Sequence, residues 1–267
     1  MLSAGTEKGL GWLLKAVYVV AGFLCFLFIV APSVLLVLAA FSEAKYFSFP
    51  PKGFSLHWFH EMASHAGYRQ SVVRSIEIAT VSTLLSVGVA LPTALSLKKN
   101  GNQTIEAIVL APLFFPLVIW ALGLIQFYGM IGFSRSSFSI ILAHTVMIMP
   151  FVFRIILQSM REMSGWLEEA AYSLGAGKWR TFRKVTLPIV APGILVGAIF
   201  GFLVSFTDVT LTMFIAGSGE ATFPVRVYSE QIQGLNPIVL AWSVVFTALI
   251  FVMSFVGEKV ARWSRFF

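Results

Sequence analysis

Residues 168–188 read EEAAYSLGAGKWRTFRKVTLP, and this stretch decides how the rest of the chain is interpreted. Trp166, Ala170 and Leu174 are spaced four residues apart, so a short helix here would present them as one stripe. Ala170 and the adjacent Ala171 keep the helix surface shallow, which lets another surface approach closely. The stretch therefore predicts a small protruding helix that docks into a groove of a partner.

The sequence also marks where this short helix ends. Gly175 can terminate it, because glycine tolerates the left-handed backbone conformation that follows a helix C-terminus. Leu187 and Pro188 then open the next apolar run, and proline suits the first turn of a helix. We expect a helix with a fixed stop and a second helix that begins shortly after it.

Apolar runs long enough to cross a bilayer surround this stretch. The chain is 58% hydrophobic and only 12% charged, with a mean hydropathy of +0.86, whereas about a quarter of a soluble globular chain is charged. A span needs roughly 20 apolar residues and must be helical in lipid. Six runs qualify, at about 16–41, 71–97, 105–131, 137–160, 188–216 and 237–261. The sequence therefore predicts an all-α polytopic membrane protein with about six transmembrane helices, forming a single domain over residues 1–267.

Two of these runs carry more detail. The first exceeds the roughly 7–15 apolar residues of a signal peptide, so we expect it to be retained as a helix. The third contains Pro112 and Pro116 close together, and we expect it to be kinked or broken.

The distribution of lysine and arginine predicts the orientation in the membrane. Thirteen of the 19 lie on the side that holds both termini and the loop at about 161–186, and six lie on the other side. Basic residues are in excess on the cytoplasmic side of membrane proteins, so both termini and this loop are expected there. The basic residues sit between apolar runs rather than along a polar stripe with stacking aromatics, which argues against a nucleic-acid partner.

One acidic residue falls inside a predicted span. Asp208 lies in the 188–216 run beside Ser205 and Thr207, which together form a polar track. Ionisable residues within a span are functional hypotheses by default. Asp208 could face a water-filled path and attract an ammonium group, or it could pair with a neighbouring helix and stabilise the bundle. The sequence does not separate these two alternatives.

Other residues are weaker candidates for a substrate path. Glu77 lies near the end of the second run, where a local ion pair with Arg74 is the favoured alternative. Aromatic side chains in the third run could line the path, although packing and lipid contact are the ordinary alternatives. His144 is expected to be an interhelical hydrogen-bond partner rather than a proton relay. The candidate path residues are Asp208, Thr207, Ser205, Glu77, Trp120 and Tyr128.

Several chemical motifs do not occur in the sequence. It has no glycine-rich phosphate loop followed by Lys-Ser or Lys-Thr, no H-E-x-x-H helix and no G-x-S-x-G turn. His57, His60 and His65 are expected to form a solvated face rather than a metal site, and the single Cys25 cannot form an internal disulfide. We therefore expect no catalytic residue, no metal site and no cofactor in this chain.

Glu169-Ala170-Ala171, followed at fixed spacing by Gly175 and by Val185-x-Leu187-Pro188, resembles the EAA loop of bacterial ABC importer permeases. In that family the loop forms a coupling helix that sits in a cleft of the cytoplasmic ATPase subunit. Val185 stands where isoleucine is usual. The resemblance implies a type I ABC importer permease fold. It also implies ATPase-coupling roles for Glu169, Ala170, Ala171, Gly175, Leu187 and Pro188.

Residues 205–209 and 223–228 are similar to the polyamine branch of these permeases, although this chain has Thr207-Asp208 where two adjacent acids are common. The resemblance implies import of a small solute, with spermidine or putrescine favoured and 2-aminoethylphosphonate or another small solute as alternatives. It implies two cytoplasmic ATPase subunits that bind ATP and Mg, and a homologous second permease in a heterodimer. It further implies a periplasmic or surface solute-binding protein and a place in the bacterial inner membrane.

A different class of transporter provides the main rival hypothesis. An ion-coupled secondary transporter could use Asp208 as its ion site, but such folds show internal inverted repeats, and we find none in this sequence. An intramembrane enzyme would need a catalytic set that the sequence does not supply.

Overall fold

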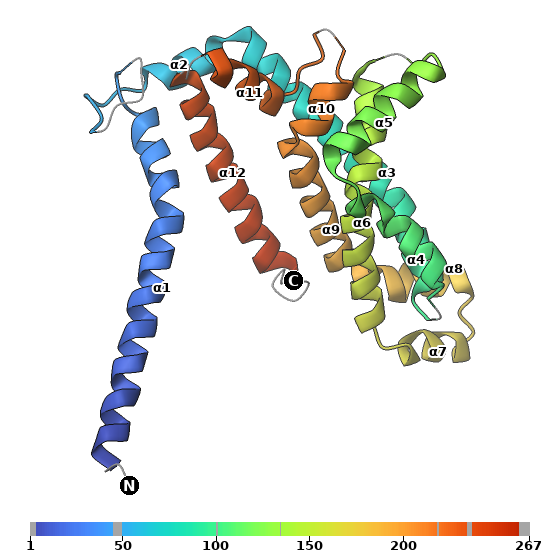
Figure 1. The fold of residues 1–267 in the computed structure, drawn as a ribbon. Coiled ribbons are helices and arrows are strands. Elements are labelled where there is room, and N and C mark those ends of the chain that lie inside the picture. The colour runs from blue at the N-terminus through green and yellow to red at the C-terminus, as the bar shows by residue number, and fades with distance from the viewer. Residues whose placement is uncertain are drawn as a thin grey trace. The chain divides into compact units, whose positions relative to one another are not determined.

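The computed structural model describes residues 4–44, 50–99, 101–133, 135–217, 219–233 and 237–261, and every regular element within these ranges is a helix (Figure 1). Five of the described helices are long and apolar enough to cross a membrane, or up to six spans exist if one bent helix pair counts as a span. The prediction of an all-α polytopic membrane protein is confirmed.

Contacts divide the chain into two compact units, Met1–Ser64 with Gly234–Ala248, and His65–Gln233 with Leu249–Phe267. In the first unit, helix α1 (Ala4–Ala40) ends in a small apolar cluster with the start of α12 (Pro237–Ala261). The short helix α2 (His57–Ser64) is attached to the same end, because the Trp58 indole N–H donates to the Ser42 carbonyl oxygen over 2.8 Å. The single domain over residues 1–267 stays a prediction.

The core of the second unit is built on α3 (Ala66–Leu97), α6 (Ser137–Glu162) and α9 (Leu187–Thr207). The buried face of α3 consists largely of serine and alanine, which lets α6 approach closely. Two of these serines bond across the helix pair, since the Ser82 and Ser86 hydroxyls donate to carbonyl oxygens of α6 over 3.1 and 3.3 Å.

The third predicted span is broken, as its prolines indicated. Helix α4 (Gln103–Leu110) continues into the 3₁₀ turn η1 (Ala111–Phe114), and α5 (Leu117–Met130) then departs at an angle of 101°. Phe115 is extended with φ −98° and ψ 132°, because the ring of a following proline disfavours the helical region for the residue before it. Pro116 therefore fixes the position of the break.

The fifth span differs from its predicted limits of 188–216. Its helical course begins earlier, with α8 (Lys178–Thr181) and the π-helical turn η2 (Phe182–Thr186), and ends with α9 at Thr207. Asp208 is extended and is followed by a separate short helix, α10 (Thr210–Ile215). Its carboxylate accepts hydrogen bonds from backbone N–H groups of α10, which starts a new helix instead of continuing α9.

Two short helices lie at opposite ends of the second unit (Figure 1). Helix α7 (Trp166–Ser173) lies at the end of α3 that carries Lys98, and α11 (Phe223–Gln233) lies at the end that carries Tyr68. Helix α3 has 32 residues and would be about 48 Å long, which exceeds a hydrocarbon core of about 30 Å. Its two ends, and with them α7 and α11, therefore belong to opposite membrane surfaces.

Candidate functional site: a protruding helix and a buried polar cluster

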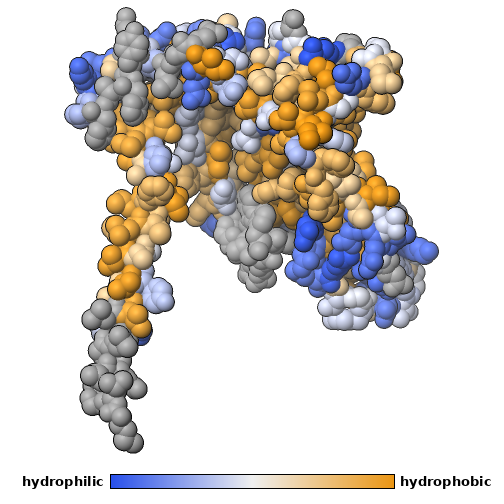
Figure 2. Space-filling view, in the orientation of Figure 1, coloured by the Kyte–Doolittle hydropathy of each residue, from blue (hydrophilic) through white to orange (hydrophobic). Residues whose placement is uncertain are grey.

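Helix α7 forms the protruding element that the sequence predicted. Trp166 is 66% exposed and Leu174 is 89% exposed, and Ala170 between them is also exposed. The predicted stripe therefore faces outward from the described part of the chain. Hydrophilic residues gather at the end of the second unit that carries α7 (Figure 2). The exposed stripe on α7 is therefore accessible to a partner.

The end of α7 is fixed by two backbone hydrogen bonds around Gly175. The Gly175 N–H donates to the Tyr172 carbonyl oxygen over 2.9 Å, and the Ala176 N–H donates to the Ala171 carbonyl oxygen over 3.0 Å. This pair of bonds is the Schellman arrangement, which needs a left-handed residue after the helix. Gly175 supplies it with φ +82°. The predicted stop at Gly175 is confirmed.

Glu168 anchors α7 to the body of the second unit. Its side chain is buried, and its Oε1 accepts hydrogen bonds from the Lys98 ammonium group on α3 and, over 2.6 Å, from the Thr186 hydroxyl. Burial alone would raise the pKa of this carboxyl group, but the hydrogen bonds from Lys98 and Thr186 outweigh it and hold the pKa below its ordinary value. Glu168 therefore stays ionised at neutral pH.

The adjacent Glu169 makes a much weaker attachment. Its carboxylate lies 3.7 Å from the Lys99 ammonium group, and the two side chains are 69% and 60% exposed. An exposed pair of this kind contributes little to stability. The sequence assigned a role to Glu169 and none to Glu168, although the adjacent Lys98 and Lys99 at the end of the second run were a signal that acidic residues of this loop pair with them.

Thr186 connects the anchor to the next transmembrane helix. It immediately precedes Leu187 and Pro188, which occupy the start of α9. The Glu168 carboxylate therefore bridges the end of α3 and the start of α9. This one side chain therefore joins α7 to two membrane-spanning segments.

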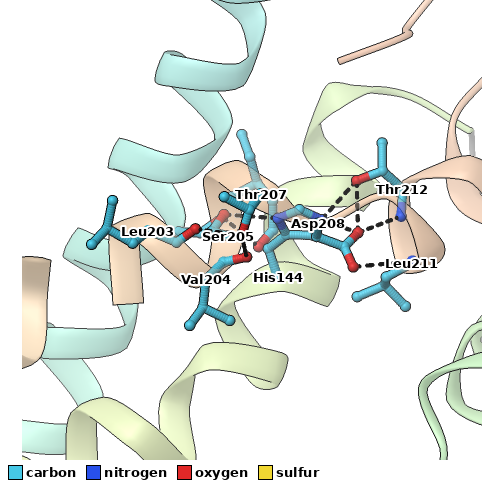
Figure 3. Close-up of polar contacts among 10 residues, drawn as sticks. His144, Leu203, Val204, Ser205, Thr207, Asp208, Leu211 and Thr212 are labelled. Atoms are coloured by element: carbon cyan, nitrogen blue, oxygen red, sulfur yellow. Dashed lines mark hydrogen bonds and ion pairs between the residues drawn. The ribbon is translucent and has the colours of Figure 1, made fainter. Parts of the chain in front are cut away.

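Asp208 occupies the break between α9 and α10 and is buried, with 5% of its side chain exposed (Figure 3). Its Oδ2 accepts hydrogen bonds from the Thr212 N–H over 2.9 Å and from the Thr212 hydroxyl over 3.1 Å, while Oδ1 accepts from the Leu211 N–H over 3.3 Å. The His144 Nε2 lies 3.5 Å from Oδ2. The carboxylate is thus held by the protein itself.

His144 connects three helices through both of its ring nitrogens. Nδ1 lies 2.8 Å from the Ser205 hydroxyl on α9, and Nε2 lies 2.9 Å from the Thr212 hydroxyl on α10 (Figure 3). The ring belongs to α6 and is 1% exposed. The predicted interhelical role of His144 is confirmed, and these contacts favour the structural alternative for Asp208 and Ser205.

The remaining path candidates are dispersed over the second unit. Thr207 is exposed, and its hydroxyl donates to the Leu203 carbonyl oxygen of its own helix over 2.8 Å. Tyr128 is buried, and its hydroxyl donates to the Ser139 carbonyl oxygen over 3.2 Å, so it packs within the core. Trp120 lines an apolar pocket of about 210 Å³ at the bend between η1 and α5.

The prediction that Glu77 forms an ion pair with Arg74 is wrong. Arg74 instead lies 3.3 Å from the Glu220 carboxylate and also donates to the Gly219 carbonyl oxygen. Glu77 is exposed, and the described residues offer it no ion-pair partner. The loop after α10 brings Glu220 across to α3, and a contact between such distant residues leaves no local pattern in the sequence.

The apolar spans and the capped, anchored helix between two of them are those of a membrane-embedded helical protein. Residues 82–265 match the family described as "Binding-protein-dependent transport system inner membrane component", and the chain belongs to this family of ABC importer permeases. It is therefore a multi-pass protein of the inner membrane. Membership in this family also rejects the rival class of ion-coupled secondary transporters.

Curated relatives place the chain near the polyamine branch. It is 25% identical to a spermidine/putrescine permease of Haemophilus influenzae, over 90% of this chain and 94% of that protein. It is 27% identical to a putrescine permease of Escherichia coli K12, over 87% and 86%. It is 26% identical to a putative 2-aminoethylphosphonate permease of Salmonella choleraesuis, over 92% and 94%. The resemblance to this branch is confirmed.

A solved structure has the same fold. The chain aligns with a bacterial alginate ABC transporter in complex with an alginate-pentasaccharide-bound periplasmic protein, with a TM-score of 0.70 over 97% of each chain. The identity is 17%, so this likeness concerns the fold alone.

Proposed function

We propose that this chain is the subunit through which ATP hydrolysis on a partner drives a small solute into the cytoplasm, with a polyamine such as spermidine or putrescine as the favoured solute. The observation that carries the proposal is the attachment of α7, whose exposed stripe leads through the buried Glu168 to two transmembrane helices. The names of the relatives support the choice of solute.

The proposed assembly has three kinds of component around this chain. Two cytoplasmic ATPase subunits bind ATP and Mg, and each contacts one coupling helix. A homologous second permease completes a heterodimer. A periplasmic or surface protein delivers the solute. In this arrangement both termini and α7 face the cytoplasm, in keeping with the excess of lysine and arginine on that side.

Coupling in this proposal is an exchange between two states of the bundle. Closure of the ATPases displaces α7, which docks through Trp166, Ala170 and Leu174. Glu169, Ala171 and Gly175 shape and end the docking helix. Leu187 and Pro188 receive the displacement at the start of α9. Nucleotide then biases the bundle from one end and the loaded binding protein from the other, which is an allosteric coupling between two sites.

A second solute is favoured by a separate observation. Asp208 is buried and already accepts three hydrogen bonds from α10, so it offers little to an ammonium group. 2-Aminoethylphosphonate, the compound named for one relative, carries an anionic phosphonate beside its ammonium group and so depends less on a free carboxylate than a purely cationic polyamine does. Under this alternative the importer and its coupling are the same, and only the solute changes. The candidate path residues Thr207, Ser205, Glu77, Trp120 and Tyr128 remain proposals under either solute.

Uptake by the complete complex reconstituted in vesicles tests both alternatives. Spermidine, putrescine and 2-aminoethylphosphonate are offered with and without ATP, and a complex whose ATPase cannot hydrolyse ATP serves as the control. Saturable uptake of a polyamine that needs hydrolysis supports the main proposal, and uptake of the phosphonate alone supports the second. Uptake driven by an ion gradient without ATP would contradict both.

A further inference from the structure

A pocket of about 610 Å³ lies beside the coupling helix, between the last turns of α3 and the segment α8–η2. Leu91 and Leu95 of α3 and Phe182 of η2 form its apolar wall. Its polar lining includes Lys98, Glu168 and Lys178, with Trp179 beside them. The Glu168 carboxylate pairs with Lys98, so Lys178 supplies the uncompensated charge of a pocket that is otherwise largely apolar.

The position of the pocket in the chain gives its depth in the membrane. Its wall belongs to two membrane-spanning segments, Ala66–Leu97 and Lys178–Thr207, close to the end of the first and the beginning of the second. A pocket at the ends of two spans crosses the boundary between hydrocarbon and headgroups. An occupant that fills it must be apolar at one end and polar at the other.

The basic side chains of the pocket indicate that the polar end of its occupant is negatively charged. Lys98 is engaged by Glu168, whereas Lys178 pairs with no acidic side chain among the described residues. The neighbouring Arg180, Arg183 and Lys184 are exposed, and the described residues likewise supply no acidic partner for them. A cluster of this kind at the cytoplasmic surface attracts anionic lipid headgroups.

Trp179 provides a second feature of a membrane boundary. Its side chain is 71% exposed although it lines the pocket, and tryptophan is enriched at the level of the headgroups. On α3, Leu95 and Leu91 lie about one and two helical turns before Lys98, which places them at the level of the acyl chains.

We propose that this pocket binds one anionic phospholipid, with its headgroup at Lys178 and an acyl chain along Leu91 and Leu95. An acidic segment of the ATPase would carry the same negative charge as a lipid headgroup. It would, however, have to enter the hydrocarbon layer to contact the apolar wall of the pocket. The bound lipid lies against both α3 and Tyr172 of α7 and so braces the coupling helix.

The test measures lipid binding to the complete complex of this chain with its ATPase. The purified, delipidated complex is titrated with dioleoylphosphatidylglycerol or dioleoylphosphatidylcholine, and bound lipid is counted by native mass spectrometry. We expect one tightly retained phosphatidylglycerol per chain and no comparable phosphatidylcholine. The substitution Lys178→Gln should weaken phosphatidylglycerol binding about fivefold, the effect of one basic side chain at a membrane surface.

Lys184→Gln is the matched control, because Lys184 lies on the same segment and is exposed but does not line the pocket. It removes the same charge outside the pocket, so it should weaken phosphatidylglycerol binding much less than Lys178→Gln does. Leu95→Trp, which fills the apolar wall without changing charge, should also weaken binding. Equal retention of the two lipids, or equal losses with Lys178→Gln and Lys184→Gln, would overturn the proposal. So would a Lys178→Gln complex that loses its ATPase but keeps its lipid.

Discussion

Glu168 and Glu169 are adjacent in the sequence, yet their surroundings differ completely. Glu168 is 4% exposed and bonded to Lys98 and Thr186, while Glu169 lies on the surface beside Lys99. The motif that identifies the loop runs through Glu169, whereas the attachment of the loop to the bundle depends on Glu168. The alternation of buried and exposed positions along one helical turn separates these two functions.

Glu168→Gln should therefore weaken the anchor while preserving the shape of the side chain. The amide leaves the Lys98 charge without a counterion, and the loss should be about 2 kcal/mol of unfolding free energy. ATP-driven uptake should fall with it. Glu169→Gln is the control and should leave thermal unfolding unchanged, because its pair is exposed. Equal unfolding temperatures for both variants would contradict the anchor.

The acid dependence of stability follows from the lowered pKa of Glu168. A carboxyl group whose pKa is lower in the folded state stabilises the fold above its unfolded-state pKa of about 4.3, and loses this contribution as the pH falls through the folded-state pKa. The difference in unfolding temperature between wild type and Glu168→Gln should be constant between about pH 6 and 8. It should shrink below about pH 4, as measured by differential scanning fluorimetry.

Asp208 tests the alternative between substrate path and structure. Asp208→Asn replaces one acceptor oxygen with an N–H donor that faces the Thr212 N–H, so we expect a loss of about 2 kcal/mol of stability. If the cluster is structural, the variant reduces the amount of folded complex but leaves the KM for uptake unchanged. His144→Gln should cause a comparable loss, and the two losses should not add. A raised KM at unchanged stability would place Asp208 on the substrate path instead.

The limits of several helices in the second unit are set by single residues. Gly175 ends α7, and Pro116 separates η1 from α5. Both positions were predictable, since glycine and proline restrict the local backbone in ways that do not depend on distant contacts. The end of α9 at Asp208 was harder to predict from the sequence. An acidic residue within an apolar run does not by itself show whether the helix continues through it or a new helix begins.

Gly175→Ala examines the helix end without altering any contact. A Cβ at this position would meet no atom within 4 Å, so its whole effect is backbone strain at φ +82°, about 1 kcal/mol. We expect the last turn of α7 to fray and the ratio of solute imported to ATP hydrolysed to fall, while membrane insertion persists. Gly165→Ala is the control, because Gly165 has φ −59° and equally open surroundings. Unchanged coupling in Gly175→Ala would argue against a fixed helix end.

For the molecule as a whole, the sequence predicted most of the fold because apolar runs of sufficient length have few alternatives in lipid. It did not predict which side chains meet across the second unit. The pairing of Arg74 with Glu220 and the attachment of Glu168 to Lys98 join residues that are far apart in the chain. Such contacts depend on how the helices pack, and the period of a helix indicates its buried face but not which residues meet across it.

Orientation is the property of the whole molecule that labelling can test. Replacing Cys25, the only cysteine, with serine gives a background without thiols. Leu174→Cys on α7 should then react with an impermeant maleimide only from the cytoplasmic side, and Gln231→Cys on α11 only from the opposite side. Both parent side chains are exposed, and their helices lie at opposite ends of the second unit (Figure 1). Labelling of both from one side would contradict the arrangement.

The enclosure of Asp208 also bears on energy conservation by the cell. A bacterial inner membrane stores a proton gradient, and a carboxylate exposed to water within a moving bundle would offer protons a relay point. Here each carboxylate oxygen already accepts hydrogen bonds from the protein, and the neighbouring imidazole contacts two hydroxyl groups. We therefore expect the break between α9 and α10 to offer protons no relay point and to leave the membrane potential intact.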